Sequence, residues 1–194
     1  MADPSDDPIW ETWESVFLKT TVLGDMIIDR SLASGQRITR IACVPRGGLY
    51  LVNILSRMLG LSGDQVISLG ISKYDRENPT QASNFKIGQL PDRSDVAGQV
   101  VLLVDEVHDS GKTAEWARDA LIGLGSAVVW TAVIHYKPHP NATSYKPDFY
   151  VETTNGWVHY PWAPIDSLGT VYQAALGKQS TEHRVAARRS SESR

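Results

Sequence analysis

The stretch Val100–Thr113, which reads VVLLVDEVHDSGKT, constrains the fold of this chain more than any other feature. Five apolar residues end in two adjacent carboxylates, Asp105 and Glu106, and a turn of small and polar residues follows. The apolar run predicts a strand buried on both faces, as in a parallel sheet. Open α/β sheets bind ligands at the carboxyl ends of such strands. Backbone N–H groups and a following helix N-terminus attract anions, so the stretch predicts a phosphate cradle beside two acids, which suits a sugar phosphate.

The tripeptide Gly-Lys-Thr at 111–113 also occurs in nucleotide P-loops, which are a competing interpretation. A P-loop has a glycine five positions before its second glycine. This chain has Glu106 there, and its carboxylate would face the nucleotide phosphates. The residues therefore disfavour a P-loop.

Strand patterns alternate with helix patterns between the two ends of the chain. We expect helices over 10–30, 49–59, 112–124 and 166–176, and strands over 39–44, 65–71, 100–104, 127–135, 149–151 and 157–159. This alternation predicts an α/β fold with a mostly parallel central sheet flanked by helices. A long polar segment at 74–97 interrupts the pattern, and loops of that length inside a compact domain are usually functional.

Composition restricts the class of protein further. The length of 194 residues suits one domain, which we expect over 1–177, and the net charge of −3 argues against nonspecific nucleic-acid binding. The single cysteine, Cys43, lies in an apolar run, so we expect a small buried residue in a reducing, cytoplasmic setting. No apolar stretch is long enough to span a bilayer. The basic, serine-rich end at 178–194 is predicted to be disordered.

The motif in Val100–Thr113 resembles the phosphoribosyl-pyrophosphate motif of the type I phosphoribosyltransferases: an apolar run, two acids, two variable residues, then Asp/Ala-Thr/Ser-Gly-x-Thr/Ser. The resemblance implies the type I phosphoribosyltransferase fold with a flexible hood loop. It also implies that Asp105 and Glu106 lie near the ribose hydroxyls and Mg²⁺, in direct contact or through water. The 5′-phosphate of phosphoribosyl pyrophosphate would then bind to Asp109, Ser110, Gly111, Lys112 and Thr113.

A second glycine-containing turn, Val44–Gly48, follows the first predicted strand. Two glycines beside an arginine can form an anion nest. The turn resembles the pyrophosphate loop of purine phosphoribosyltransferases, in which the peptide before the basic residue is often cis, here Pro45–Arg46. The segment 72–97 occupies the place of the family's hood, which closes over the reaction centre and excludes water. The pyrophosphate-binding residues implied are Arg46, Gly47, Gly48, Lys73 and Tyr74.

The base-specificity segment is expected over 135–166. Lys137 follows a predicted strand, and Tyr-Lys-Pro-Asp-Phe follows at 145–149. This spacing resembles the 6-oxopurine branch of the family, in which the strand-end lysine binds the 6-oxo group. An aromatic at the position of Trp157 stacks on the purine in that branch, a contact worth roughly 1–3 kcal/mol by analogy with nucleic-acid bases, and the backbone of Val158 would meet the base edge. Asp109 would act as general acid or base for the purine N7 proton.

One position departs from that branch. Its members usually carry an aspartate shortly after the aromatic segment, which helps to hold a second Mg²⁺. This chain has Ala163 and Pro164 there, and the nearest acid is Asp166. Either Asp166 substitutes, or water and ligand alone hold that metal.

Taken together, the resemblance implies an enzyme of purine salvage. It would transfer the phosphoribosyl group of phosphoribosyl pyrophosphate to N9 of guanine, xanthine or hypoxanthine, with Mg²⁺ as cofactor and pyrophosphate as second product. Dimers or tetramers of identical subunits are common in the family. Two alternatives stay open: a regulator of the same fold that senses phosphoribosyl pyrophosphate, and a phosphoribosyltransferase for another base, such as a pyrimidine.

Overall fold

The structure is a computed structural model, and it describes residues 7–73, 85–138, 142–165 and 168–169. These residues belong to two compact units. The larger unit contains Trp13–Trp157, and the smaller unit contains Pro8–Thr12 with the residues from 158 onward. The two units are described separately below, and the single domain expected over 1–177 stays a prediction.

A six-stranded sheet forms the centre of the larger unit. Its strands run in the order β3-β2-β6-β8-β7, and β9 pairs with the opposite edge of β8. Every neighbouring pair in this sheet is parallel, which confirms the predicted α/β fold with a mostly parallel sheet. The strands are β2 (Arg40–Cys43), β3 (Val66–Ser68), β6 (Val100–Val104), β7 (Val107–His108), β8 (Val128–Tyr136) and β9 (Phe149–Thr153).

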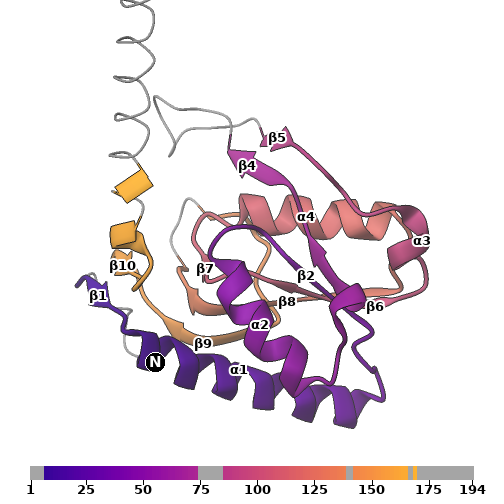
Figure 1. Cartoon of the computed structure of the whole chain (residues 1–194), viewed down its shortest axis with the longest axis horizontal. Helices are drawn as coiled ribbons and strands as arrows, with labels where there is room; N and C mark the ends of the chain where they lie inside the picture. Colours follow the sequence, from indigo (N-terminus) through magenta and orange to yellow (C-terminus); the bar gives the residue numbers. More distant parts are fainter. Residues whose placement is uncertain (1–6, 74–84, 139–141, 166–167, 170–194) are drawn as a thin grey trace, which may run out of the picture. The chain divides into compact units, whose positions relative to one another are not determined.

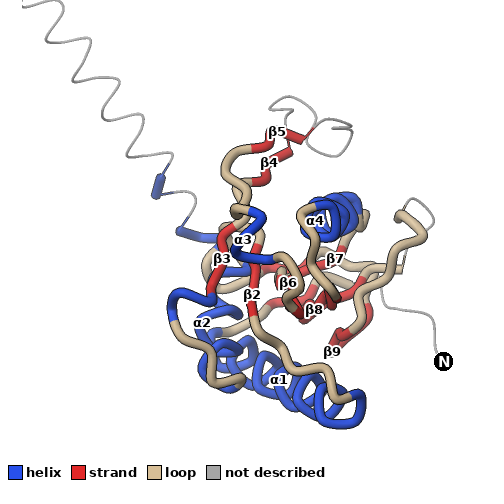
Figure 2. Tube along the Cα trace, turned by 90° about the vertical axis from the view of Figure 1, so that its right-hand side faces the viewer, coloured by secondary structure: helices blue, strands red, loops and turns tan. Residues whose placement is uncertain are grey.

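Helices cover both faces of this sheet. The helices α1 (Trp13–Ser34) and α2 (Gly48–Met58) lie together on one face, and α4 (Lys112–Gly123) lies on the other (Figures 1 and 2). Because successive side chains of a strand point to opposite faces, β6 contributes to both cores. On one side Val101 and Leu103 pack with Ala117 and Leu121 of α4. β6 therefore packs against helices on both faces of the sheet, α2 on one and α4 on the other.

Several element bounds differ from those expected. The first helix begins at residue 13 rather than 10 and continues to residue 34, because residues 9–10 form a strand instead. The strand expected over 65–71 is wrong as a single element: a 3₁₀ turn at Gly63–Gln65 leads into β3, and a separate strand β4 (Ile71–Lys73) follows. Of the helix expected over 166–176, residues 168–169 are helical, and the others lie outside the described residues.

The polar segment expected to form a long loop contains two short elements. β5 (Phe85–Ile87) pairs antiparallel with β4, and α3 (Arg93–Val96) follows. Asp92 begins α3 in a capping box with Asp95, in which each side chain is paired with the other residue's backbone N–H. Residues 74–84 of the predicted hood lie outside the described part of the chain.

The described part of the smaller unit contains one strand pair. β1 (Ile9–Trp10) and β10 (Val158–His159) pair in parallel, and the rings of Trp10 and His159 stack with centroids 3.8 Å apart. Neither the β1 strand nor this pairing was expected from the sequence. In neither unit do the described residues include a helix with the length and apolar character needed to cross a membrane.

Candidate active site

A cavity of about 340 Å³ lies in the larger unit beyond the carboxyl ends of β2 and β6. Two turns supply most of its wall: the turn after β2, from Val44 to Arg46, and the segment from Asp105 to Gly111. Ile71, Thr113 and Ala114 complete the lining. The structure therefore brings together the two sequence motifs expected to bind one ligand, although residues 47–104 lie between them in the sequence.

The two acids stand where one strand is interrupted. β6 and β7 pair with successive parts of β8, and Asp105 and Glu106 lie between them. The ladder continues through this break, because the Asp105 N–H donates to the Ala132 carbonyl at 3.2 Å and the Glu106 carbonyl accepts from Ile134 and His135. The Asp105 carboxylate accepts the Glu106 N–H at 2.9 Å. The backbone of both acids is thereby fixed in the sheet, and both residues line the cavity.

The turn at Asp109–Thr113 leads from β7 into α4. Gly111 is the N-cap of α4 and has a φ of +77°, a left-handed conformation that glycine adopts without steric cost. The turn thus presents the N-terminus of α4 to the cavity, where unpaired N–H groups favour an anion. Asp109, Ser110, Gly111 and Thr113 line the cavity. Lys112, predicted with them, is exposed and is not among the lining residues.

The turn after β2 meets the acids at close range. The peptide bond between Pro45 and Arg46 is cis, as the resemblance implies. A Cβ placed on Gly47 would lie 2.0 Å from the carboxyl carbon of Glu106, and one on Gly48 would lie 2.7 Å from the Val104 carbonyl oxygen. Both positions therefore exclude a side chain in this arrangement. Arg46 also lines a second cavity of about 970 Å³ against α1 and α2.

Lys137 directly follows β8 and lies beside the cavity residue Asp109. The residue is 7% exposed, and its ammonium nitrogen lies 4.0 Å from Asp109 Oδ1. It also lies 5.4 Å from the centre of the Trp157 ring, which is 67% exposed. The lysine stem is buried while the charged end reaches a carboxylate and an aromatic face. The structure thus brings Lys137, Asp109 and Trp157 together, as a base-binding site would require.

The remaining predicted site residues are placed as follows. Lys73 ends β4, and its side chain is outside the described part of the structure, as are Tyr74 and Asp166. Val158 belongs to the smaller unit, where it pairs with Ile9. The pyrophosphate-binding role of Lys73 and Tyr74, the base-edge role of Val158 and the metal role of Asp166 remain predictions.

Cys43 ends β2 below the first turn and is fully buried. Burial, together with a smaller contribution from the nearby Asp105 carboxylate, raises the pKa of its thiol to about 11. A thiol with this pKa stays protonated at neutral pH and is a poor nucleophile. This agrees with the interpretation of Cys43 as a small buried residue.

Sequence reasoning missed three residues that hold the turn at Asp109–Thr113. His108 and Tyr145 form a hydrogen bond, and the Thr143 N–H donates to the Ser110 carbonyl at 2.8 Å. His108 occupies one of the motif's two variable positions, and Tyr145 belongs to a segment assigned to base specificity. A histidine directly after the apolar residue Val107 and directly before the polar turn was the available signal.

Comparison with known proteins agrees with this architecture. Residues 21–166 match the model of the phosphoribosyl transferase domain. A purine phosphoribosyltransferase from Pyrococcus horikoshii Ot3 is 28% identical with a TM-score of 0.63, over 80% of this chain and 93% of that one. A hypothetical protein from Neisseria gonorrhoeae with bound ppGpp is 25% identical with a TM-score of 0.65, over 88% and 98%.

A third structure supports the fold alone. The Helicobacter pylori xanthine-guanine-hypoxanthine phosphoribosyltransferase is 22% identical with a TM-score of 0.66, over 84% of this chain and 99% of that one. The family match covers most of the chain and includes both cavity turns. With its parallel sheet, its paired acids and the Gly111-capped turn before α4, this chain belongs to the type I phosphoribosyltransferase family.

Proposed function

We propose that this protein transfers the 5-phosphoribosyl group of phosphoribosyl pyrophosphate to N9 of a 6-oxopurine. The observation that carries the purine assignment is the arrangement of Lys137, 4.0 Å from Asp109 and 5.4 Å from the ring of Trp157. An ammonium group donates to a carbonyl oxygen and has no acceptor to offer an exocyclic amine. An exposed indole stacks on any planar base. The combination therefore favours a purine with a 6-oxo group over adenine.

The phosphoribosyl pyrophosphate half of the proposal is supported by the cavity walls. The 5′-phosphate would bind at Asp109–Thr113, where the N-terminus of α4 offers unpaired N–H groups. The ribose hydroxyls would face Asp105 and Glu106. The pyrophosphate would then meet Arg46, which lines the cavity, and the backbone of the turn that continues through Gly47 and Gly48.

In this reaction the protein itself forms no covalent bond to the substrate. The bond between ribose C1 and the pyrophosphate oxygen loosens, N9 of the base attacks C1, and pyrophosphate leaves with the bonding electrons. The base must lose a proton on the way to the nucleotide, and the Asp109 carboxylate accepts it from N7. Asp109 is half exposed and stands between the phosphate turn and Lys137, so it can reach a base held by the lysine.

Mg²⁺ fits this donor set. Asp105 and Glu106 supply carboxylate oxygens at the cavity wall, and oxygen ligands are those that Mg²⁺ prefers. These residues would hold it in direct contact or through water. When bound, the ion neutralises charge on the pyrophosphate leaving group.

A spectrophotometric panel tests the proposal. Wild-type protein is assayed with phosphoribosyl pyrophosphate, Mg²⁺ and, in turn, guanine, hypoxanthine, xanthine, adenine and uracil, with pyrophosphate release as a second readout. We expect turnover with at least one 6-oxopurine and a kcat/KM for adenine at least about tenfold lower. Preferred use of adenine or uracil would refute the 6-oxopurine assignment while leaving phosphoribosyl transfer intact.

Two substitutions separate the contributions of Lys137 and Trp157. Stacking is indifferent to the exocyclic group, so Trp157→Ala should weaken all accepted purines by similar factors. Lys137→Gln introduces an amide that both donates and accepts, so it should narrow the preference for 6-oxopurines over adenine. The measurement is the ratio of kcat/KM for guanine or hypoxanthine to that for adenine. A ratio changed by Trp157→Ala and unchanged by Lys137→Gln would reverse the two roles.

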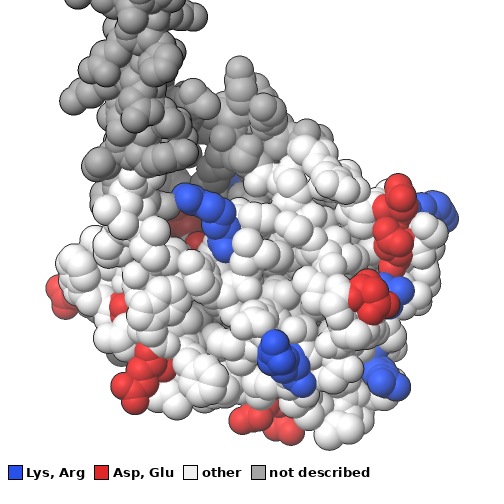
Figure 3. Space-filling view, viewed as in Figure 1, with Lys and Arg blue, Asp and Glu red and all other residues white. Residues whose placement is uncertain are grey.

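A second candidate function is regulatory binding. It is favoured by the likeness to the Neisseria gonorrhoeae protein with bound ppGpp, a guanine nucleotide with two pyrophosphate groups. A nucleic-acid-binding regulator receives less support, because Lys and Arg are scattered among acidic residues on the face seen in Figure 3, in the described residues. Calorimetry with phosphoribosyl pyrophosphate and with ppGpp, beside the base panel, distinguishes the two functions. Tight binding without turnover of any base would favour the regulator.

A further inference from the structure

A short segment, Thr143–Asp148, which we call the brace, contacts the turn at Asp109–Thr113, the proposed phosphate turn, and its residues are not among those that line the cavity. It makes two contacts with the turn and with the residue that precedes it. The Thr143 N–H donates to the Ser110 carbonyl at 2.8 Å, and the His108 Nε2 lies 3.1 Å from the Tyr145 carbonyl oxygen. The brace thus contacts both ends of the tripeptide His108–Ser110 that leads into Gly111.

The contact with Tyr145 determines which ring nitrogen of His108 carries a hydrogen. A carbonyl oxygen accepts only, so Nε2 must carry the hydrogen. The ring is 2% exposed, so water does not compete for this hydrogen bond. The imidazole therefore serves as a fixed donor to the brace.

The ring also sets the space available to the phosphate turn. A Cβ placed on Gly111 would lie 2.6 Å from His108 Nε2 and 2.6 Å from Thr143 Oγ1. Gly111 is therefore held between the histidine ring and the threonine hydroxyl of the brace. Because its φ of +77° sets the direction of the first turn of α4, the two contacts fix where the N–H groups of that helix point.

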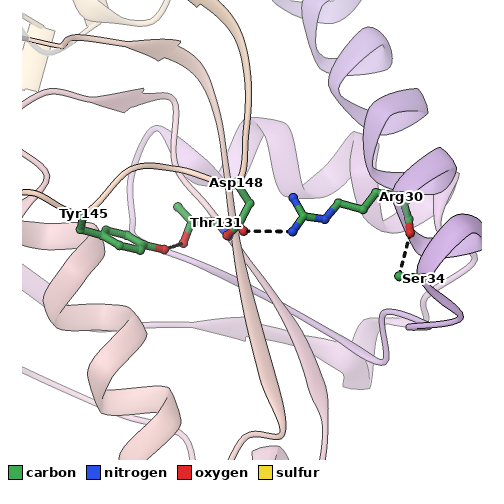
Figure 4. A network of polar contacts seen from close by, with 5 residues as sticks. All are labelled: Arg30, Ser34, Thr131, Tyr145 and Asp148. Carbon is green, nitrogen blue, oxygen red and sulfur yellow. Dashed lines mark hydrogen bonds and ion pairs between the residues drawn. The ribbon is translucent and has the colours of Figure 1, made fainter.

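The brace is itself attached to the body of the larger unit (Figure 4). The hydroxyl of Tyr145 pairs with that of Thr131 on β8, and the Thr131 N–H donates to the Asp148 carboxylate at 2.8 Å. Asp148 in turn lies 3.7 Å from the Arg30 guanidinium on α1. The sheet and a helix of the opposite layer thereby hold the brace still, so that it can position the turn.

We propose that His108 is a positioning residue for the sugar-phosphate substrate, whose Nε2–H bond to Tyr145 holds the phosphate turn in the shape that receives the 5′-phosphate. The inference rests on the proposed function, because it assumes that Asp109–Thr113 binds that phosphate. It assigns a role to a position that the family motif leaves variable. The His108 ring is 2% exposed and bonded to Tyr145, so its effect on the substrate passes through the turn.

The test replaces His108 by two unbranched side chains of similar length, one with a hydrogen-bond donor and one without. His108→Gln keeps an N–H donor near the position of Nε2, whereas His108→Met fills the space without a donor. Binding of ribose 5-phosphate and of Mg²⁺-phosphoribosyl pyrophosphate is measured by calorimetry, and KM is measured for each substrate. We expect His108→Met to weaken both ligands about tenfold, as loss of one buried hydrogen bond would. His108→Gln should restore most of the affinity, and the KM for the purine should change less than about twofold in both.

A control separates positioning from general destabilisation. Thr20→Val removes a buried hydroxyl that bonds to the Val16 carbonyl within α1, away from the turn. It should lower the melting temperature and leave ribose 5-phosphate affinity unchanged. Equal affinities for wild type and His108→Met, or equal losses in the Met and Gln variants, would overturn the positioning role. No binding of either ligand by wild-type protein would instead overturn the proposed function.

Discussion

The two turns that enclose the cavity both require glycine, but for different physical reasons. In the turn after β2, Gly47 has an ordinary right-handed backbone with φ −61°, and the Glu106 carboxylate occupies the space beside it. In the turn before α4, Gly111 has φ +77°, and the buried His108 ring and Thr143 close the space. A flexible side-chain end limits the space at Gly47, whereas backbone conformation and buried neighbours limit Gly111; Gly48, next to Gly47, faces the Val104 carbonyl oxygen instead.

This difference indicates at which of the two glycines, Gly47 or Gly111, an added methyl group harms the fold less. The Glu106 carboxylate ends a side chain with three rotatable bonds, so it can move away from an added methyl group. The neighbours of Gly111 cannot move as freely, because one is a buried ring and the other is bonded through its backbone to the turn. Gly111 is therefore the rigid glycine position of the site, and Gly47 is the adjustable one.

The largest effect is expected at the exposed acid of the turn that contains Gly111. Asp109→Asn keeps the shape and removes the base, so kcat should fall by roughly 10²–10⁴-fold. Because Asp109 is half exposed, the melting temperature and the affinity for phosphoribosyl pyrophosphate should change little. Steady-state rates, a thermal melt and calorimetry check these three quantities. Unchanged kcat would remove Asp109 from the mechanism.

Gly111→Ala should damage both stability and binding. A left-handed backbone costs a residue with a Cβ about 1–2 kcal/mol, and the contacts with His108 and Thr143 add to that. Gly98→Ala is the matched control, since Gly98 has φ +72° and open space around it. Denaturant unfolding should show a larger loss for Gly111→Ala than for Gly98→Ala. The comparison of the two turns fails if the losses are equal and ligand affinity is unchanged in both.

Gly47→Ala should lower the affinity for substrate and leave the stability of the fold unchanged. The added methyl group displaces the Glu106 carboxylate from its place in the cavity wall. We expect affinity for Mg²⁺-phosphoribosyl pyrophosphate to fall about fivefold, as for loss of one hydrogen bond, with a melting temperature close to wild type. A cycle with Glu106→Gln checks the cause, because the two changes should be less than additive. Additive effects would mean that Gly47 acts independently of Glu106.

The smallest effect is expected at Cys43, the last residue of β2, directly before the turn that contains Gly47. Its pKa is raised from 9.0 to about 11 in the folded protein, so the folded state keeps a proton that the unfolded state releases above pH 9. The unfolded state binds fewer protons in that range, and stability therefore falls as pH rises from about 9 to about 11. Urea unfolding at several pH values measures this slope. Cys43→Ala should make the slope shallower, and an unchanged slope would contradict the assignment.

Much of the site could be predicted from the sequence because its parts are local. The run Val100–Val104, the two acids and the glycine turn are contiguous, and a buried strand followed by a helix places such a turn at the sheet edge. The same argument located the turn after β2, and the resemblance to the 6-oxopurine branch singled out Lys137 at the end of a predicted strand. In each case the chemistry follows from residues within about ten positions of one another.

The remainder depends on contacts between distant residues. The sequence predicted neither the β1–β10 pair nor the break of strand 65–71 into β3 and β4, because short strands gain their stability from partners rather than from their own residues. It also assigned Tyr145–Phe149 to base specificity, whereas Tyr145 contacts His108 beneath the phosphate turn.

The amino-acid sequence by itself determined the family, the parallel sheet and the identity of the acids and glycines around the cavity. Only the tertiary structure decided what each glycine faces: the Glu106 carboxylate beside Gly47, and the His108 ring and Thr143 beside Gly111. Local residue patterns fix backbone conformation and the end of a strand, since these depend on neighbouring residues. Which side chain fills the space beyond a turn depends on segments brought together by burial, and no local pattern specifies that.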